Sequence, residues 1–202
     1  MKTMQQFVET IKIEDGKALN LNFHQARMES TMRHFFAHTP VPVLSGVLSP
    51  TPDMHFYKAR VVYGVRGVKD VQYAPYKMRE IRSLKLVEDN EIDYSFKSTD
   101  RACLNRLTAQ KGDCDEVLIV KNGLLTDTSF TNVAVFDGER WLTPKHPLLL
   151  GTKRASLLER QVIKEADISV ETLMNAQKVS LINAMIDLGE IEITTQMVNR
   201  GL

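Results

Sequence analysis

The feature that most constrains this sequence is the order of three short segments in its second half. A lysine, Lys97, follows the aromatic residue Phe96. Thirty positions later, segment 126–132 (TDTSFTN) carries one carboxylate, Asp127, and segment 151–154 (GTKR) then opens a predicted helix with a glycine. An amine, a carboxylate and a turn of suitable size for a phosphate thus follow one another. A lysine amine is nucleophilic only when deprotonated, so a catalytic lysine must lie where burial or nearby cations favour the neutral amine.

Each of these segments also has an ordinary structural explanation. Most lysines are solvated surface groups, and on this interpretation Lys97 ends a strand in water. Asp127, between Thr126 and Thr128, is placed to form an Asx turn. Arg101, four positions after Lys97, suits a surface position equally well. The order of the segments, and not any one of them, indicates a shared function.

Six motifs in the same order make nearly the whole chain resemble one family. They comprise residues 7–10 with 15–16; 21–28, with the H-x-x-R signature; Lys97 with Arg101; 115–118 and 122–123, leading into the carboxylate segment; 151–154; and 182–185. The chain resembles the fold-type IV pyridoxal-phosphate enzymes. These comprise the class IV aminotransferases, including the branched-chain and D-amino-acid aminotransferases, and aminodeoxychorismate lyase.

This resemblance implies a two-lobed α+β fold like that of D-amino-acid aminotransferase. It implies a small N-terminal α/β lobe, residues 1–92, and a larger β-rich C-terminal lobe with helices, residues 93–202. The second lobe is expected to carry the catalytic lysine and most of the cofactor site, with the cofactor between the lobes. The resemblance also implies pyridoxal 5'-phosphate as cofactor, a small amino-group substrate and a homodimer whose second subunit completes each pocket.

The resemblance implies catalytic roles for two residues. Lys97 would form the Schiff base with the cofactor and later move a proton from the substrate α-carbon. Asp127 would keep the pyridine nitrogen protonated, because an adjacent buried anion raises the pKa of that nitrogen. The family usually has glutamate at this place, five residues before an asparagine, as Asp127 stands before Asn132. The aspartate is one methylene shorter, which is roughly 1.5 Å of reach.

The resemblance also implies the residues that bind the rest of the cofactor. Arg27, with His24 on the same helical face, is expected to bind the phosphate. Further cofactor contacts are expected from Gly151, Thr152, Lys153, Asn183 and Ala184. Lys153 is equally suited to the phosphate and to solvent. Four cationic residues are candidates for the substrate carboxylate by position only: Arg60, Arg66, Lys77 and Arg79.

Three classes of function remain open at this point. The first is an enzyme, either a lyase that releases p-aminobenzoate and pyruvate from aminodeoxychorismate or an aminotransferase. The pair Asn183–Ala184 favours the lyase, since aminotransferases often carry Gly-Thr there. The second is a catalytically impaired homologue that binds pyridoxal phosphate and has a non-enzymatic role. The third is a structural or interaction protein that reuses the fold.

The composition excludes several other classes of partner. Lys and Arg together number 26 and Asp and Glu 25, a formal net charge of +1. No run of basic residues exceeds two, so neither nucleic acid nor an anionic membrane is expected as a partner. No stretch approaches the ~20 apolar residues of a membrane span, and residues 1–6 lead into no signal-peptide core. We therefore expect a cytoplasmic protein. Cys103 and Cys114 suit free thiols, and neither has the spacing of metal ligands.

Hydrophobic periodicity predicts the following elements. Strands are expected at 5–13 and 17–23, as a hairpin around Asp15-Gly16, and at 58–63, 80–86, 117–120, 133–136, 140–143 and 179–182. Helices are expected at 24–38, 98–111 and 152–166. The prolines between residues 40 and 52 predict an irregular segment or a short helix.

Overall fold

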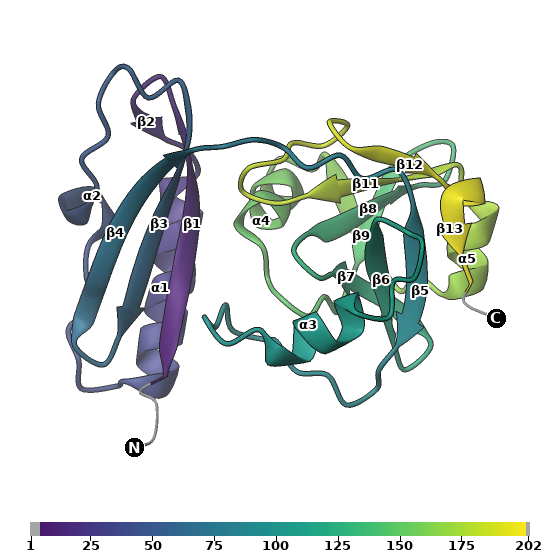
Figure 1. Ribbon diagram of the computed structural model, residues 1–202, viewed down its shortest axis with the longest axis horizontal. Coiled ribbons are helices and arrows are strands. Elements are labelled where there is room, and N and C mark those ends of the chain that lie inside the picture. The colour runs from purple at the N-terminus through teal and green to yellow at the C-terminus, as the bar shows by residue number, and fades with distance from the viewer. Residues whose placement is uncertain (1–4, 201–202) are drawn as a thin grey trace. The chain divides into compact units, whose positions relative to one another are not determined.

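The structure, a computed structural model, describes residues 5–200 and divides them into two compact units. Unit 1 contains the described residues up to Met78 and the short segment Phe96–Asp100. Unit 2 contains Arg79–Ser95 and the described residues from Arg101 onward. Each unit has both helices and strands (Figure 1), so the predicted α+β class is confirmed.

The boundary between the units differs from the expected division at residue 92. It falls after Met78, and the segment with Lys97 belongs to unit 1 instead of the C-terminal part. Backbone pairing is the reason. The N–H of Val8 donates to the carbonyl of Lys97 at 3.0 Å, and the N–H of Thr99 donates to the carbonyl of Gln6 at 3.0 Å. The lysine segment is thus an addition to the edge of the first sheet.

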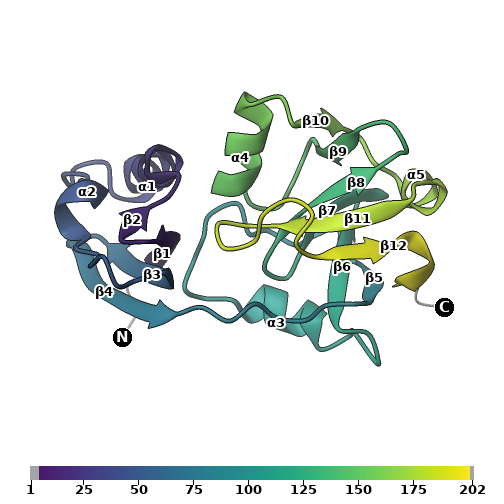
Figure 2. The same ribbon diagram turned by 90° about the horizontal axis from the view of Figure 1, so that it is seen from above.

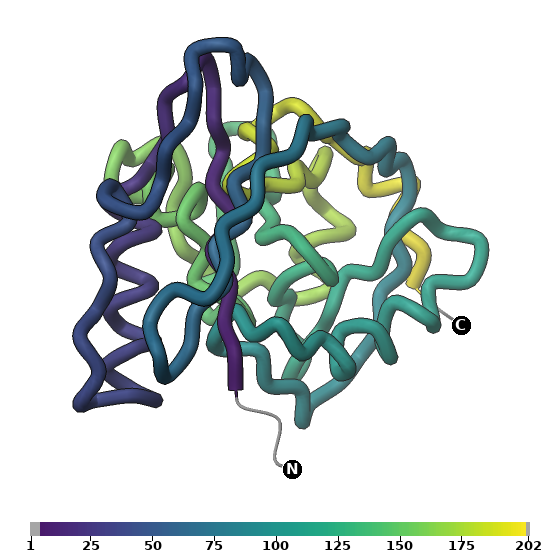
Figure 3. Tube along the Cα trace, turned by 60° about the vertical axis from the view of Figure 1, so that its left-hand side comes forward, coloured from purple at the N-terminus to yellow at the C-terminus, as the bar shows by residue number. Residues whose placement is uncertain are grey.

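Unit 1 is an antiparallel sheet with one long helix. The strands lie in the order β2 (Lys17–Ala18), β1 (Gln6–Glu14), β3 (Phe56–Gly64) and β4 (Gly67–Pro75). The Cα trace in Figure 3 follows β1, β3 and β4 side by side. Helix α1 (Leu21–Phe35) covers the sheet, and α2 (Leu44–Val47) is the short helix expected among the prolines (Figure 1).

Alternation along β1 explains how this unit is packed. Phe7, Ile11 and Ile13 are fully buried, and they share a core with Met28 and Met32 of α1. Residues two apart on a strand point to the same face, and a helix covers that face here. Glu9 has the same parity as these apolar residues and is also fully buried. A carboxylate therefore lies within an otherwise apolar layer.

The start of unit 1 follows the predicted hairpin only in part. Asp15 and Gly16 have φ angles of 47° and 73°, as a two-residue turn between antiparallel strands requires. The second strand ends at Ala18 and not at residue 23, because Asn20 takes a left-handed conformation and α1 begins directly after it. Strand β4 was not predicted, since its charged and polar residues hide the apolar alternation of an edge strand.

Unit 2 is built around a mixed sheet with four short helical segments. Its elements are β5 (Leu84–Glu88), α3 (Ala102–Thr108), β6 (Glu116–Lys121), β7 (Leu124–Thr128), β8 (Asn132–Phe136), β9 (Trp141–Pro144), α4 (Thr152–Glu159), β10 (Ile163–Ala166), α5 (Val170–Asn175), β11 (Lys178–Ile182), β12 (Glu192–Thr194), η1 (Thr195–Met197) and β13 (Val198–Asn199). The order is β10-β9-β8-β7-β6-β5-β13, and β11 pairs with β8 and β12 (Figure 2).

Strand β6 of unit 2 is apolar on both faces. Val117, Leu118 and Ile119 of β6 are all fully buried. A helix covers β6 on one side, since Leu104 and Leu107 of α3 share a core with Val117 and Ile119. Strands buried on both sides appear in a sequence as continuous apolar runs, which is why β6 and β8 were predicted correctly.

Two helices of unit 2 are shorter than expected, and one of its strands was not predicted. The helix expected at 152–166 ends at Glu159, and residues 163–166 form β10, because Gln161 has a left-handed φ of 57°. Leu157 and Ile163 nevertheless enter the same core, which explains the misleading helical period. The helix expected at 98–111 spans only α3, because residue 98 bridges to β1. The turn at 121–123 leads into β7, which was not predicted.

The described part of the chain has no membrane-spanning helix and no metal-binding cluster. None of its helices is both long and apolar enough to cross a membrane. Between residues 5 and 200, no group of three or more His, Cys, Asp or Glu side chains is arranged to hold a metal ion. Cys103 and Cys114 are free thiols.

Candidate active site

A buried cluster of three polar side chains occupies the core of unit 1. The Glu9 carboxylate accepts a hydrogen bond at Oε1 from Nε of Arg27, at 3.0 Å, and at Oε2 from Nη2, at 2.5 Å. Nδ1 of His24 lies 2.6 Å from Oε2 of the same carboxylate. His24 and Arg27 reach Glu9 together because residues three apart share a face of α1. This two-pronged contact fixes the plane of the Arg27 guanidinium.

The protonation states of the cluster follow from its burial and charges. Burial acts to raise the pKa of Glu9, but Arg27 and His24 together outweigh it and hold that pKa at about 2. Burial is the chief reason that the pKa of His24 is lowered, and the charges of Arg27 and Lys97 lower it further. His24 is therefore neutral at pH 7, and its Nδ1 hydrogen donates to Glu9. Within the cluster, the negative charge of Glu9 is balanced by the positive charge of Arg27.

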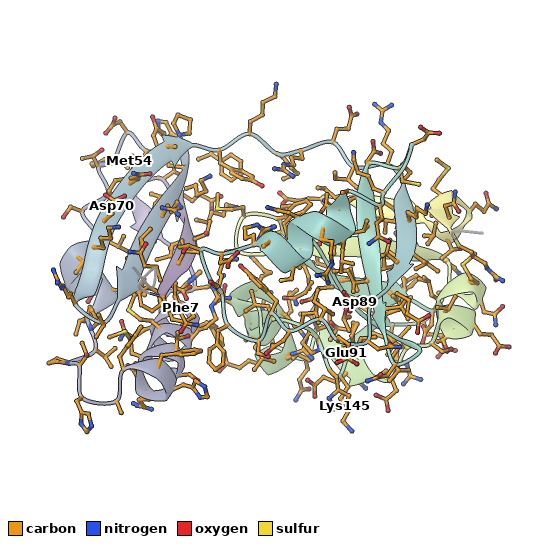
Figure 4. The ribbon with its side chains drawn as sticks, turned by 60° about the horizontal axis from the view of Figure 1, so that its bottom comes forward. Phe7, Met54, Asp70, Asp89, Glu91 and Lys145 are labelled. Carbon is orange, nitrogen blue, oxygen red and sulfur yellow. The ribbon has the colours of Figure 1, made fainter. Side chains whose placement is uncertain are left out.

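Lys97 lies beside this cluster in unit 1. The carbonyl of Lys97 accepts a hydrogen bond from the N–H of Val8, and the charge of Lys97 is one of the smaller causes that lower the pKa of His24. The preceding residue, Phe96, packs its ring against those of Phe7 and Phe35, at centroid distances of 6.4 and 4.8 Å. Phe7, labelled in Figure 4, is itself fully buried. Lys97 is half-buried and follows an aromatic residue that packs in the core, and its catalytic role stays a prediction.

A second buried carboxylate, Asp127, lies in unit 2 where β7 pairs with β8. Its Oδ1 accepts from Nδ2 of Asn132 at 2.8 Å, and its Oδ2 accepts from the N–H of Leu149 at 2.8 Å. Asp127 is 5% exposed. Burial raises its pKa to about 7, although the bonds from Leu149 and Asn132 and the charge of Arg154 act in the opposite direction. Its hydrogen-bond partners in the described chain, Asn132 and the backbone of Leu148 and Leu149, are uncharged.

Asp127 is not the turn-former of the ordinary explanation. Oγ1 of Thr128 has that role, because it accepts from the N–H groups of Phe130 and Thr131 at 3.3 and 2.9 Å. The two oxygens of Asp127 instead tie its strand to β8 and to the loop that precedes α4. An Asx turn at this position is thus contradicted.

Gly151 begins α4 and packs closely against Asn132. A Cβ atom at position 151 would lie 1.9 Å from Oδ1 of Asn132, so this position admits only glycine without displacement. The amide nitrogen of Asn132 also donates to the carbonyl of Leu149 at 2.8 Å. Asn132 therefore connects Asp127 to the segment that leads into α4. The first residue of that helix, Thr152, is buried. The N–H groups of its first turn lie at the positive end of the helix dipole.

The two basic residues of segment 151–154 are buried and form polar contacts. Lys153 is 8% exposed and forms an ion pair with Asp187, so the alternative in which it points to solvent is wrong. Nη2 of Arg154 donates to the carbonyl of Pro144 at 2.8 Å and to Oε1 of Glu165 at 2.6 Å. Both side chains therefore help to anchor α4 within unit 2.

Asn183 and Arg101 hold the loop between β7 and β8. Nδ2 of Asn183 donates to the carbonyl of Phe130 at 3.2 Å, and its Oδ1 accepts from the N–H of Met185 at 2.8 Å. Nη2 of Arg101 donates to the carbonyl of Ser129 at 2.7 Å. Ala184 lies within the turn that Asn183 closes with Ile186. Asn183 and Arg101 thus contact the loop that directly follows Asp127, and not Asp127 itself.

The structure therefore groups the predicted residues in two sets. Lys97 and Arg27 both belong to unit 1, and the charges of both lower the pKa of His24. Asp127, Gly151 and Asn183 are linked within unit 2 by the contacts above. Sequence reasoning missed Glu9, Asp187 and the linking role of Asn132. Glu9 had a detectable signal, because a carboxylate occupied an inward position of an alternating strand.

Comparison with known proteins decides the family. Residues 65–192 match the family model for Amino-transferase class IV. The chain belongs to this family. Fold-type IV enzymes of this kind use pyridoxal phosphate and act on small amino substrates, so the resemblance stated from the motifs is confirmed.

Three similar proteins extend this result. A Haemophilus influenzae protein without a stated activity is 38% identical over 186 residues, which cover 90% of this chain and 98% of that protein. A crystal structure from Haemophilus somnus, provisionally assigned as 4-amino-4-deoxychorismate lyase, is 35% identical with a TM-score of 0.84, over 93% of this chain and 100% of that one. A Schizosaccharomyces pombe protein, provisionally named aminodeoxychorismate lyase, is 28% identical over 84% of this chain and 82% of that protein.

Proposed function

We propose that this protein is a pyridoxal-phosphate-dependent enzyme that acts on the amino group of a small substrate. Its first candidate reaction is that of aminodeoxychorismate lyase. The observation that carries the proposal is Asp127, a buried carboxyl group whose hydrogen-bond partners are uncharged and whose pKa is raised to about 7. A protonated ring nitrogen beside this carboxyl group would stabilise its ionised form. The donor chemistry of the site therefore fits the cofactor.

Lys97 is the residue that would hold the cofactor covalently. When bound, pyridoxal phosphate supplies a ring that accepts the electron pair of a bond to the substrate α-carbon. Nζ of Lys97, once released by the substrate amine, would take up the proton from that carbon. The neighbouring Glu9 and Arg27 balance in charge, and His24 is neutral.

Each unit carries groups suited to bind a phosphate. In unit 1, Glu9 orients the Arg27 guanidinium, whose side chain is 13% exposed. In unit 2, Gly151 and Thr152 present the backbone N–H groups of the first turn of α4, a favourable place for an anion. Lys153 would contribute through its backbone, since its ammonium is paired with Asp187. Asn183 and Ala184 would act by holding the loop next to Asp127.

Two observations favour the lyase over the aminotransferase. Asn183 and Ala184 occupy a position where aminotransferases often have Gly-Thr. Two of the similar proteins are also provisionally assigned as aminodeoxychorismate lyases. Aminotransferase activity is the second candidate, because both reactions begin with the same lysine and cofactor. We also propose that the chain works as a homodimer, as family members do.

A spectroscopic titration followed by a substrate panel tests the proposal. Added pyridoxal phosphate should produce the visible absorption band of a lysine-bound cofactor. The protein should then release p-aminobenzoate and pyruvate from aminodeoxychorismate. Loss of the band with branched-chain amino acids or D-alanine, without p-aminobenzoate release, would identify an aminotransferase instead. A band with no turnover of any substrate would favour the impaired homologue, and no band would contradict the proposal.

A further inference from the structure

An ion pair joins the first turn of α4 to the segment that follows β11. Lys153 is the second residue of α4, and its ammonium pairs with the carboxylate of Asp187, 34 positions later in the sequence. Lys153 is buried, whereas the side chain of Asp187 is 43% exposed. Burying an ammonium costs free energy unless a partner compensates it, so this position of Lys153 depends on Asp187.

The carboxylate of Asp187 stands on a backbone that is bound at several points. Asn183 and Ile186 exchange two backbone hydrogen bonds, each of 3.1 Å, and Ile186 is fully buried. The N–H of Asp187 donates to Oε2 of Glu190 at 2.6 Å, and its carbonyl accepts from the N–H of Glu190 at 3.2 Å. A carboxylate on so constrained a turn defines where its partner ammonium lies.

The ion pair completes a closed series of contacts around the start of α4. Asn132 joins Asp127 to the segment that leads into this helix. Asn183 joins the turn before Asp187 to the loop between β7 and β8, which follows the strand of Asp127. The Lys153–Asp187 pair then joins this turn back to α4. The first turn of α4 is therefore held from two sides, by the contacts of Asn132 and by Asp187.

We propose that Lys153 and Asp187 are positioning residues, whose ion pair fixes the first turn of α4 in the arrangement that receives the cofactor phosphate. This inference rests on the proposed function, in which the N–H groups of Gly151 and Thr152 bind that phosphate, and it adds a role for Asp187. A buried ion pair often stabilises a fold no more than apolar residues of similar size would, but its directional contact selects one arrangement. Neither side chain needs to touch the phosphate, since the pair acts through the backbone of the helix turn.

Calorimetric titration with pyridoxine 5'-phosphate and with pyridoxine tests this role. Neither compound has the aldehyde that a lysine amine attacks, so neither forms a covalent bond to Lys97, and the ratio of their Kd values isolates the phosphate contribution. Asp187→Asn removes the charge and keeps the volume. Coupled neighbours typically interact by an amount equal to roughly 2- to 150-fold in affinity. We therefore expect Asp187→Asn to raise the Kd of pyridoxine 5'-phosphate about tenfold and that of pyridoxine less than about twofold.

The direction of the change separates positioning from direct binding. If the ammonium of Lys153 bound the phosphate itself and Asp187 only competed for it, Asp187→Asn would bind pyridoxine 5'-phosphate more tightly than the wild type does. Tighter binding, or binding equal to that of the wild type, would overturn the proposal.

A variant of Lys153 shows whether the two side chains act as a pair. Lys153→Met should also raise the Kd of pyridoxine 5'-phosphate about tenfold. The double variant Lys153→Met/Asp187→Asn should lose no more affinity than either single variant, because the same contact is lost in all three. Losses that multiply in the double variant would overturn the inference. Glu192→Gln is the matched control, since Glu192 pairs with Lys178 in the same unit, and it should leave both Kd values unchanged.

A role in folding alone would give a different pattern. Both ligands would then lose affinity by the same factor, and circular dichroism would show a matching decrease in Tm; that pattern would overturn the inference. Pyridoxine 5'-phosphate that bound the wild type no more tightly than pyridoxine would overturn it too. The proposed function is tested separately, by the visible band of pyridoxal phosphate on the wild-type protein. An absent band, with the Kd changes above still observed, would contradict the proposed function and support the positioning role.

Discussion

Replacing Glu9 by glutamine removes the charge at the centre of the cluster in unit 1 while keeping its volume. The pKa of Glu9 falls from its usual 4.5 to about 2 in the folded protein. Since one pKa unit corresponds to about 1.36 kcal/mol, the folded state favours the ionised form by about 3 kcal/mol. Breaking a buried ion pair typically costs a similar amount, about 3–5 kcal/mol. We therefore expect Glu9→Gln to lower the free energy of unfolding by about 3 kcal/mol at pH 7.

The sign of the pH dependence provides a second check on Glu9. A carboxyl group with a lowered pKa in the folded state contributes stability above its unfolded pKa, and that stability is lost as the pH falls through the folded pKa. The difference between wild type and Glu9→Gln should therefore be constant above pH 4.5 and shrink as the pH approaches 2. A variant that differs equally at pH 7 and pH 2.5 would contradict the assigned ionisation.

Urea denaturation followed by far-ultraviolet circular dichroism measures this difference. For a protein of this size, about 3 kcal/mol also corresponds to a decrease in Tm of roughly 6–12 °C. Glu29→Gln is the control in the same unit, because the side chain of Glu29 is 34% exposed and pairs with Arg33, whose side chain is 74% exposed, one turn further along α1. It should change stability by less than about 0.5 kcal/mol. If Glu9→Gln were as mild as Glu29→Gln, the reasoning about the buried cluster would be refuted.

Three further predictions concern the cofactor residues. Arg27→Ala should weaken pyridoxal phosphate binding by roughly 30- to 5,000-fold in Kd but weaken phosphate-free pyridoxal far less; equal losses in titrations of the two compounds would exclude a phosphate contact. Asp127 has a raised pKa of about 7, so its contribution to the stability of the cofactor-free protein is present below its usual value of 3.8 and lost as the pH rises through 7. Urea midpoints at pH 5 and 8 should therefore fall less with pH in Asp127→Asn than in wild type, and equal slopes would count against the assigned pKa. Gly151→Ala should displace Asn132 and cost about 1–3 kcal/mol, whereas Gly46→Ala, whose added Cβ meets nothing within 4 Å, should be tolerated in the same denaturation assay.

The sequence predicted the family and much of the fold because those features are local. The turn at Asp15-Gly16 follows from residues that accept positive φ angles, and strand β6 follows from a continuous apolar run. The order of motifs around Lys97 and Asp127 was sufficient to recognise the class IV aminotransferase family. The roles of individual site residues remain predictions.

The features that the sequence did not predict depend on tertiary contacts. Leu157 and Ile163 fit one helical stripe, yet they belong to a helix and a strand that share a core. Nothing in the sequence around Lys153 indicates its partner, because Asp187 is distant in the sequence and only the fold brings the two side chains together. The pairing of the lysine segment with β1 joins residues about ninety positions apart, so the assignment of Lys97 to unit 1 could not come from local patterns.

Chemical trapping of the cofactor tests the central claim most directly. The protein is incubated with pyridoxal phosphate, reduced with borohydride and digested, and the modified peptide is located by mass spectrometry. We predict one stoichiometric adduct on Lys97, absent from a Lys97→Ala protein that retains its wild-type circular dichroism spectrum. Lys153→Ala, tested in parallel, should still carry the adduct on Lys97. An adduct on another lysine, or none in the wild-type protein, would contradict the assignment of Lys97.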